Sequence, residues 1–246
     1  MRIERFCFPG AGGAQLAGVV RRPDGDVVGS ALIAHCFTCG KDIHTTARLA
    51  KALTRAGWLT MTFDFTGIGD SGGSFSEKTV RTNVGDISRA AVALLERNAG
   101  PCLLIGHSLG GAAAVLAAAR VKTADRVIAI AAPSDTEHVE HLWAGGRRHA
   151  DGSVETSIGG RPFRVGAAFQ ADLAEHDVLG AAGEIDRPFL VVQAGADTIV
   201  GREQTERLAA AGDAELITIA DADHLFSGAG AASALADQVL GWLERT

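Results

Sequence analysis

The sequence has no tyrosine and few aromatic residues of any kind, since they make up 5% of its 246 residues. It also lacks a long apolar run. The longest one, from Leu109 to Ala119, is well short of the roughly 18 residues that a membrane-spanning helix requires. Met1 to Arg5 carry charges of both signs, and no apolar core of a signal peptide follows them. We therefore expect a cytoplasmic protein with no membrane partner.

Clustered positive charge is a second absence. The 23 Lys and Arg residues are outnumbered by 29 Asp and Glu residues, which gives a net charge of −6, and no basic cluster is longer than a pair. A surface that follows nucleic-acid phosphates needs clustered basic residues. We therefore expect no nucleic-acid partner.

Cysteine is scarce, with four residues at positions 7, 36, 39 and 102. So few in a chain of this length do not indicate a disulfide framework. Cys36 and Cys39 form a C-x-x-C pair, a spacing found in redox motifs and in halves of zinc sites. No second pair stands at matching spacing, so we expect no metal and no cofactor. We favour buried small hydrophobic residues as the role of both cysteines, with a redox pair as the alternative.

Short β-rich runs alternate with amphipathic or small apolar runs along the whole chain. The predicted strands are Ile3–Phe8, Leu16–Arg22, Ala31–Ala34, Trp58–Phe63, Cys102–Gly106, Arg126–Ala131, Phe189–Gln193 and Glu215–Ile219. The predicted helices include Val80–Arg97, Leu109–Arg120 and Ala231–Glu244. This alternation is typical of a doubly wound α/β fold with an eight-stranded, mostly parallel sheet. Because no linker-like segment interrupts the sequence, residues 1–246 are predicted to form one domain.

A nucleophile is indicated where the fifth predicted strand ends, because Gly106, Ser108 and Gly110 fit the pattern G-x-S-x-G between a strand and a helix. The glycines let strand and helix approach closely around a strained serine. The turn also sets the Leu109 amide at a helix N-terminus, where it can stabilise an oxyanion. The alternative is that Ser108 only caps the helix.

Serine needs a general base, and in this fold the acid and then the histidine follow the serine along the chain. His224 follows the last predicted strand and is the predicted base. Asp197 follows the strand before it and is the predicted acid, with Asp135 as its rival. The other downstream histidines are expected to be solvated surface residues: His138, His141, His149 and His176.

The loop after the third predicted strand, residues 35–42, is expected to supply the second oxyanion amide, and Phe37 is our choice. Lys41 and Asp42 are expected to form a loop ion pair or a helix cap. Asp64, at the start of a glycine-rich loop after the fourth strand, is expected to hold that loop. His107 is counted with the substrate-binding residues because it adjoins Ser108, although its side chain is expected to diverge and to pack.

Five motifs together resemble one family, the α/β-hydrolase domain that bacteria often fuse to a C-terminal OsmC-type peroxide-resistance domain. They are residues 35–42 (HCFTCGKD), 63–69 (FDFTGIG), 106–112 (GHSLGGA), 132–135 (APSD) and 222–225 (ADHL). The resemblance spans essentially the whole chain and implies an α/β-hydrolase fold with Ser108, Asp197 and His224 as its triad. This chain departs from the family in ending at Thr246 without an OsmC-type domain, and in carrying Gly40 where the family commonly has Ser.

The segment from residue 133 to residue 187 is expected to form a small cap over the active site. In residues 154–165, apolar and polar residues alternate on either side of Gly159 and Gly160, which predicts a β-hairpin. Residues 166–177 are predicted to form a short amphipathic helix. Three aromatic residues of this segment are expected to narrow the acyl pocket together with Phe37: Trp143, Phe163 and Phe169. The alternative is that they only join the cap to the core.

These features predict a serine hydrolase that cleaves a small or short-chain carboxylic ester through an acyl-enzyme. Thioesterase, amidase and perhydrolase chemistry share the same triad and stay open. A thiol-redox or peroxide-response role for Cys36 and Cys39 is the alternative from another class. The expected partner is a small-molecule ester, and the sequence leaves a homodimer open.

Overall fold

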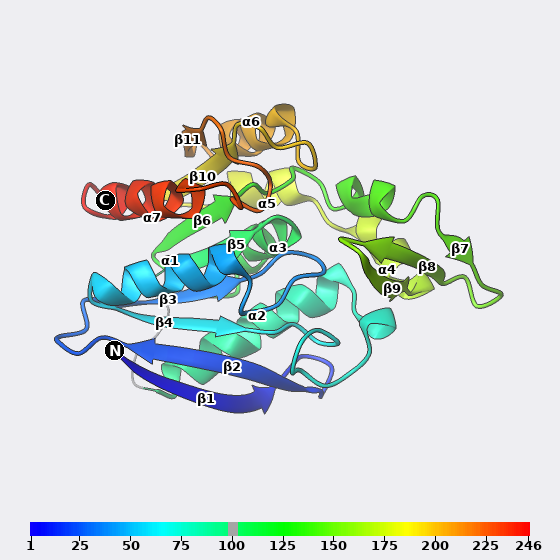
Figure 1. Ribbon diagram of the computed structural model, residues 1–246, viewed down its shortest axis with the longest axis horizontal. Coiled ribbons are helices and arrows are strands. Elements are labelled where there is room, and N and C mark those ends of the chain that lie inside the picture. Colours follow the sequence, from blue (N-terminus) through cyan, green and yellow to red (C-terminus); the bar gives the residue numbers. More distant parts are fainter. Residues whose placement is uncertain (98–102) are drawn as a thin grey trace.

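The computed structural model describes residues 1–97 and 103–246, and an eight-stranded sheet forms its centre (Figure 1). The strands lie side by side in the order β1 (Arg2–Pro9), β2 (Gln15–Arg22), β4 (Trp58–Phe63), β3 (Gly29–Ala34), β5 (Leu103–His107), β6 (Arg126–Ile130), β10 (Phe189–Ala194) and β11 (Glu215–Ile219). β1 and β2 pair antiparallel with their neighbours, and every pairing from β4 to β11 is parallel. All eight predicted strands are confirmed with small shifts at their ends. Cys102, predicted to begin the fifth strand, lies outside the described residues.

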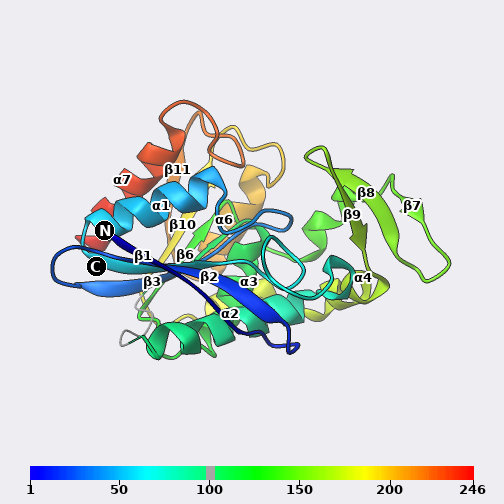
Figure 2. The same cartoon turned by 60° about the horizontal axis from the view of Figure 1, so that its bottom comes forward.

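Helices cover both faces of the sheet. One face carries α1 (His44–Arg55) and α7 (Ala231–Leu243), and the other carries α2 (Val80–Leu95), α3 (Leu109–Ala118), α5 (Val178–Gly183) and α6 (Arg202–Ala211) (Figure 2). Each face therefore has its own apolar core. β10 has an apolar run from Phe189 to Val192 because it sends Val191 into one core and Val192 into the other. The doubly wound architecture predicted from the sequence is confirmed.

A capping box fixes the start of α2. The Thr79 hydroxyl accepts from the Thr82 N–H at 3.0 Å, and the Thr82 hydroxyl accepts from the Thr79 N–H at 2.8 Å. This reciprocal pair satisfies two amides that have no partner within the helix. A short 3-10 helix, η1 (Phe75–Glu77), precedes it. Lys78 therefore lies between two fixed turns, at a defined place in the chain.

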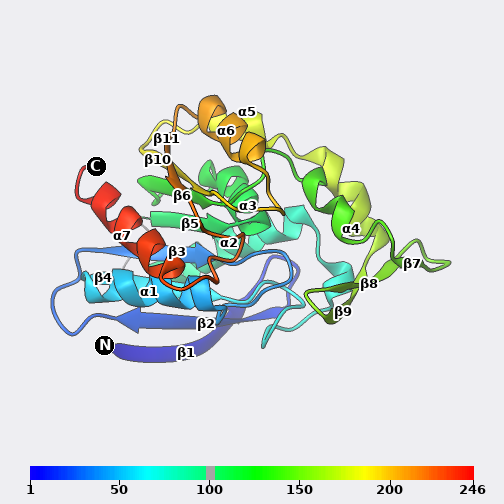
Figure 3. The same cartoon turned by 45° about the horizontal axis from the view of Figure 1, so that its top comes forward.

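The segment after β6 folds into a cap at one end of the sheet, away from both chain termini (Figure 3). It contains η2 (Glu137–Leu142), a small sheet of β7 (Arg147–Arg148), β8 (Val154–Ile158) and β9 (Arg161–Val165), and then α4 (Ala167–Asp172) and η3 (Leu173–Glu175). β8 and β9 form the predicted hairpin, which turns at two glycines with positive φ. None of the helices within residues 1–97 and 103–246 is long and apolar enough to cross a membrane.

Candidate active site

Ser108 lies on the sharp turn between β5 and α3. Its backbone angles, φ 56° and ψ −129°, are strained for a residue with a side chain, and its N–H donates to the Ile130 carbonyl at 2.8 Å. A Cβ on Gly106 would lie 2.2 Å from the Gly110 oxygen, and one on Gly110 would lie 2.1 Å from the His35 oxygen. Glycine is therefore required at both positions for the turn to close.

Three side chains from separate loops form one hydrogen-bonded chain. His224 Nε2 lies 2.9 Å from the Ser108 hydroxyl, and His224 Nδ1 lies 2.7 Å from the nearer Asp197 carboxylate oxygen. Because a carboxylate only accepts, Nδ1 carries the proton and Nε2 is left to accept from the hydroxyl. The arrangement can therefore remove the hydroxyl proton of Ser108.

The Asp197 carboxylate is itself held by the backbone. Its second oxygen accepts from the Ile199 and Val200 N–H groups at 2.8 and 2.9 Å, and its side chain is 1% exposed. Asp135, the rival for this place, accepts from the His138 N–H at 2.7 Å instead. The structure thus brings Asp197 to His224, and Asp135 begins the cap.

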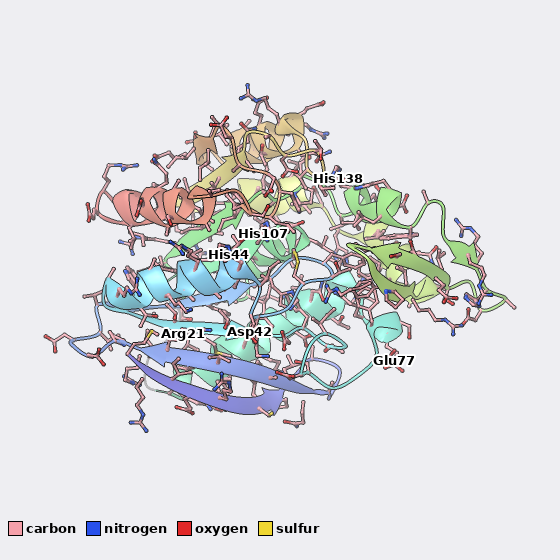
Figure 4. All side chains as sticks on the ribbon, viewed as in Figure 1. Arg21, Asp42, His44, Glu77, His107 and His138 are labelled. Atoms are coloured by element: carbon pink, nitrogen blue, oxygen red, sulfur yellow. A yellow bond between two sulfur atoms is a disulfide. The ribbon has the colours of Figure 1, made fainter. Side chains whose placement is uncertain are left out.

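His107 lies behind His224 and away from the cavity, which differs from the expectation that it binds substrate. Its Nε2 donates to the His224 carbonyl at 2.8 Å, and its ring packs against the His224 and Phe226 rings. Burial, and then the neighbouring His224, lower the pKa of His107 to about 3. Figure 4 shows His107 at the centre of the molecule, where β5 ends. Adjacent side chains on the turn diverge, so a neutral imidazole here supports the loop that carries His224.

The two candidate oxyanion donors are the N–H groups of Phe37 and Leu109. Among residues 1–97 and 103–246, neither of them donates to a protein acceptor. His35 fixes the peptide that precedes Phe37, because its Nδ1 donates to the Cys36 carbonyl at 2.7 Å while its Nε2 accepts from the Phe65 N–H at 3.1 Å. In a trans peptide the N–H points opposite to the carbonyl, so the Phe37 N–H is turned away from the His35 ring.

His35 has no exposed surface, and burial lowers its pKa to about 4. The side chain is therefore neutral near pH 7, as its two hydrogen bonds require. Sequence reasoning missed this role. In the sequence, His35 is marked only by its position directly after a buried strand, and a histidine at such a position can have several roles.

Cys36 and Cys39 are joined by a disulfide, which corrects the prediction of two separate buried thiols. The loop turns back between them, with the Cys39 N–H bonded to the Cys36 carbonyl at 3.4 Å, and this brings their Cα atoms to 5.3 Å. That separation lies in the range that disulfides require. A three-residue spacing in sequence did not reveal the turn, which is why the prediction was wrong. Phe37 lies within the closed loop.

The next residues of this loop form an ion-pair network around Lys41, which confirms the predicted Lys41–Asp42 pair and the predicted role of Asp64 in holding the glycine-rich loop. The Lys41 amine lies 2.8 Å from the Asp64 carboxylate, 2.6 Å from Asp70 and 3.3 Å from Asp42. Burial lowers the pKa of Lys41, but the hydrogen bonds to Asp64 and Asp70 outweigh it and raise the pKa above its usual value. Asp64 also accepts from the Lys41 and Asp70 N–H groups. It therefore ties residues 35–42, which we call the oxyanion loop after its predicted role, to the glycine-rich loop after β4.

A cavity of about 650 Å³ opens onto Ser108 and His224, between the sheet and the cap. Most of its apolar lining is aliphatic and comes from the cap and from the loops after β10 and β11: Val139, Leu142, Ile158, Ile199, Val200 and Leu225. His138 and His141, expected to be solvated surface residues, also line it, as does Arg161. Figure 4 shows His138 between the sheet and the β8–β9 hairpin. The polar composition of the cap sequence concealed these contacts.

Three of the aromatic residues expected in the pocket lie outside its lining. Phe37 lines the cavity, whereas Trp143 and Phe169 are buried behind it, with ring centroids 5.8 and 5.0 Å from that of Phe37. Phe163 packs on Phe75 at 4.8 Å. These rings join the cap to the core, which was the alternative interpretation. Within the described chain, no group of three or more His, Cys, Asp or Glu side chains is arranged to hold a metal ion.

Comparisons with known proteins agree on the fold. The sequence model of the alpha/beta hydrolase family matches residues 31–238. The crystal structure of the esterase domain of a Rhodothermus marinus protein is similar at 33% identity, covering 100% of this chain and 99% of that one, with a TM-score of 0.82. None of the curated proteins compared matches the chain.

Two further structures share the fold at lower identity. Est1E from Butyrivibrio proteoclasticus, solved with ferulic acid bound, is 18% identical over 98% of both chains, with a TM-score of 0.82. The Pyrococcus furiosus esterase Pf2001 is 19% identical over 99% of this chain and 92% of that one, with a TM-score of 0.75. The predicted α/β-hydrolase fold is confirmed.

Proposed function

The chain belongs to the alpha/beta hydrolase family, and from that premise we propose that it is a serine esterase for small or short-chain carboxylic esters. The observation that carries the proposal is the continuous hydrogen-bonded chain from Ser108 through His224 to Asp197. Serine is a weak nucleophile unless a base accepts its proton as it attacks. The esterase domain at 33% identity supports the choice of an ester over other acyl compounds.

Ser108 Oγ attacks the ester carbonyl carbon while its proton passes to His224 Nε2, and Asp197 stabilises the imidazolium that results. The negative charge on the former carbonyl oxygen is stabilised by the N–H groups of Leu109 and Phe37. His224 then gives the proton to the departing alkoxide oxygen, which leaves an acyl group on Ser108. A water molecule, deprotonated by His224, attacks that acyl group and releases the carboxylic acid and free Ser108.

The cavity supports a small acyl group. Its volume of about 650 Å³ is that of a site for a small molecule, and its aliphatic walls close around Ser108. An acyl chain of a few carbons buries its apolar surface there at about 0.8 kcal/mol per methylene. We expect a long chain to extend past the cap into water, where each further methylene adds nothing.

Thioesters, amides and peracids are the related substrates, since they use the same three residues. A thiol-redox function is the second candidate, favoured by the Cys36–Cys39 disulfide at the cavity wall. The motif at residues 35–42 supports placing the chain close to the hydrolase domains that are fused to OsmC-type domains.

Hydrolysis of p-nitrophenyl acetate by the wild type and by Ser108→Ala tests the proposal. Loss of the nucleophile is expected to lower kcat by about 10⁶-fold. Ser88→Ala is the matched control, because this serine lies on α2 and its hydroxyl donates to the Val84 carbonyl of the same helix. If Ser108→Ala retained wild-type turnover while folded, Ser108 would not be the nucleophile.

A further inference from the structure

Lys78 is buried without any exposed surface, beside the oxyanion loop. Its amine donates to the Phe37 carbonyl at 3.0 Å, and within the described residues this carbonyl is the one acceptor that the amine contacts. Lysine is among the residues that are least often fully buried. The esterase mechanism described above does not use it.

The surroundings of the Lys78 amine are aromatic rather than acidic. It lies 4.8 Å from the centre of the Phe37 ring, 4.9 Å from that of Phe75 and 5.8 Å from that of Phe65. The ionisable groups that act on it electrostatically are Asp86, on α2, and His35, on the oxyanion loop. Burial lowers the pKa of Lys78 to about 7. Keeping an amine with one acceptor in such a place is unfavourable for stability.

We propose that Lys78 is a positioning residue of the oxyanion hole: by holding the Phe37 carbonyl, it keeps the Phe37 N–H directed at the developing oxyanion. This inference rests on the proposed esterase function. Lys78 acts through a hydrogen bond to the Phe37 backbone carbonyl, and both the ammonium and the neutral amine can donate this bond.

The argument follows from the two peptide planes that meet at Phe37. His35 holds the carbonyl before Phe37, and Lys78 holds the carbonyl after it, at 2.7 and 3.0 Å. With both planes fixed, φ and ψ of Phe37 cannot change without breaking a buried hydrogen bond. With Lys78 removed, the second plane is free to turn and Phe37 can shift as a whole, so its N–H, although still turned away from His35, is no longer aimed at the position of the oxyanion.

The consequence is specific to the transition state. An oxyanion exists only after the serine attacks, so a misdirected donor lowers kcat and leaves ground-state binding unchanged. Loss of one whole oxyanion donor costs about 10²–10³-fold in kcat. Loss of its support is expected to cost less, roughly 10- to 100-fold.

The test is Lys78→Met, which removes the amine but keeps an unbranched chain of similar length among the rings. We measure kcat and KM on p-nitrophenyl acetate, and Ki for an aryl trifluoromethyl ketone, whose adduct with serine carries the oxyanion. The expected result is a kcat lowered about 10- to 100-fold, KM within about threefold of wild type, and Ki raised by the same factor as kcat falls.

Ile87→Ala is the matched control, because Ile87 is buried on α2, the helix that follows Lys78, and its loss destabilises the fold without removing a hydrogen bond. It is expected to lower Tm while kcat and Ki stay unchanged. If Lys78→Met lowered Tm but left kcat or Ki at wild-type values, Lys78 would be only structural and the proposal overturned.

Should Lys78→Met fail to fold, Lys78→Gln takes its place in the same measurements. Its amide N–H is one bond too short to reach the carbonyl fully, so an intermediate loss in kcat and Ki is expected, and wild-type values would overturn the proposal. Ser108→Ala is run beside these variants. Turnover by Ser108→Ala would refute the esterase mechanism itself, which separates that failure from a failure at Lys78.

Discussion

At the scale of single residues, the site depends on hydrogen bonds whose directions are fixed. Asp197 accepts from the Ile199 and Val200 amides with one oxygen and from His224 with the other. These bonds determine which nitrogen of His224 carries the proton. His35 and His107 are held in the same way by backbone carbonyls. The buried imidazoles of His35 and His107 therefore act through their tautomers rather than through their charge.

Asp197→Asn is predicted to lower kcat by about 10⁴-fold, because an amide nitrogen facing His224 Nδ1 favours the wrong tautomer of the histidine. Asp135→Asn is the control, since Asp135 bonds the His138 amide instead, and its kcat on p-nitrophenyl acetate should stay within a few-fold of wild type. If kcat fell strongly in Asp135→Asn and stayed near the wild-type value in Asp197→Asn, the assignment of the acid would be reversed.

A Cys36→Ala/Cys39→Ser double variant is predicted to keep kcat within roughly tenfold of wild type, equivalent to about 1.4 kcal/mol in the barrier. The proposed oxyanion donors are backbone amides, so we expect no sulfur to take part in the reaction. Wild type treated with a reductant should behave like the variant in the same assay. A loss of several hundredfold in either would show that the disulfide is required for the geometry of Phe37.

At the scale of elements, the sequence predicted the strands, the main helices and the cap hairpin because each has a periodic pattern of its own. β10 has a continuous apolar run, and β8 alternates. What lines the cavity could not be predicted in this way. His138 and His141 lie in a polar segment, and only the folding of the cap against the loops after β10 and β11 brings them to the cavity. Lys78 precedes α2 in sequence, and nothing local marks it as buried.

The cap predicts a preference for short acyl chains. On p-nitrophenyl esters from acetate to palmitate, kcat/KM should peak at a few carbons, because the aliphatic walls around Ser108 enclose a limited volume. Ile158→Phe, which fills the cavity from β8, should shift the peak to shorter chains. Val92→Phe, on the exposed face of α2, should not shift it. A value of kcat/KM that kept rising beyond about eight carbons would indicate an open groove instead.

At the scale of the whole molecule, buried neutral histidines link stability to pH. The folded-state pKa is about 4 for His35 and about 3 for His107, whereas the pKa of a solvated histidine is 6.5. Between these values the unfolded chain binds more protons than the folded one, so the free energy of unfolding falls as the pH drops from about 7 to 4. Above pH 7 both groups are neutral in both states and contribute no slope.

Urea unfolding between pH 4 and pH 7 tests this linkage on the wild type and on His107→Phe. The variant should lose about 1.4 kcal/mol per pH unit of the wild-type slope below pH 6, since one proton fewer is taken up on unfolding. Ile87→Ala is the control, because it removes no titratable group, and its slope should be unchanged. Equal slopes for wild type and His107→Phe would mean that folding does not lower the pKa of His107.

The measurement that most directly tests the central claim is covalent labelling with a fluorophosphonate, read by intact mass. A serine activated by His224 attacks the phosphorus and displaces fluoride, which leaves one stable adduct. The account predicts one adduct on the wild type, none on Ser108→Ala, and unchanged labelling of Ser88→Ala. Equal labelling of the wild type and Ser108→Ala would contradict it.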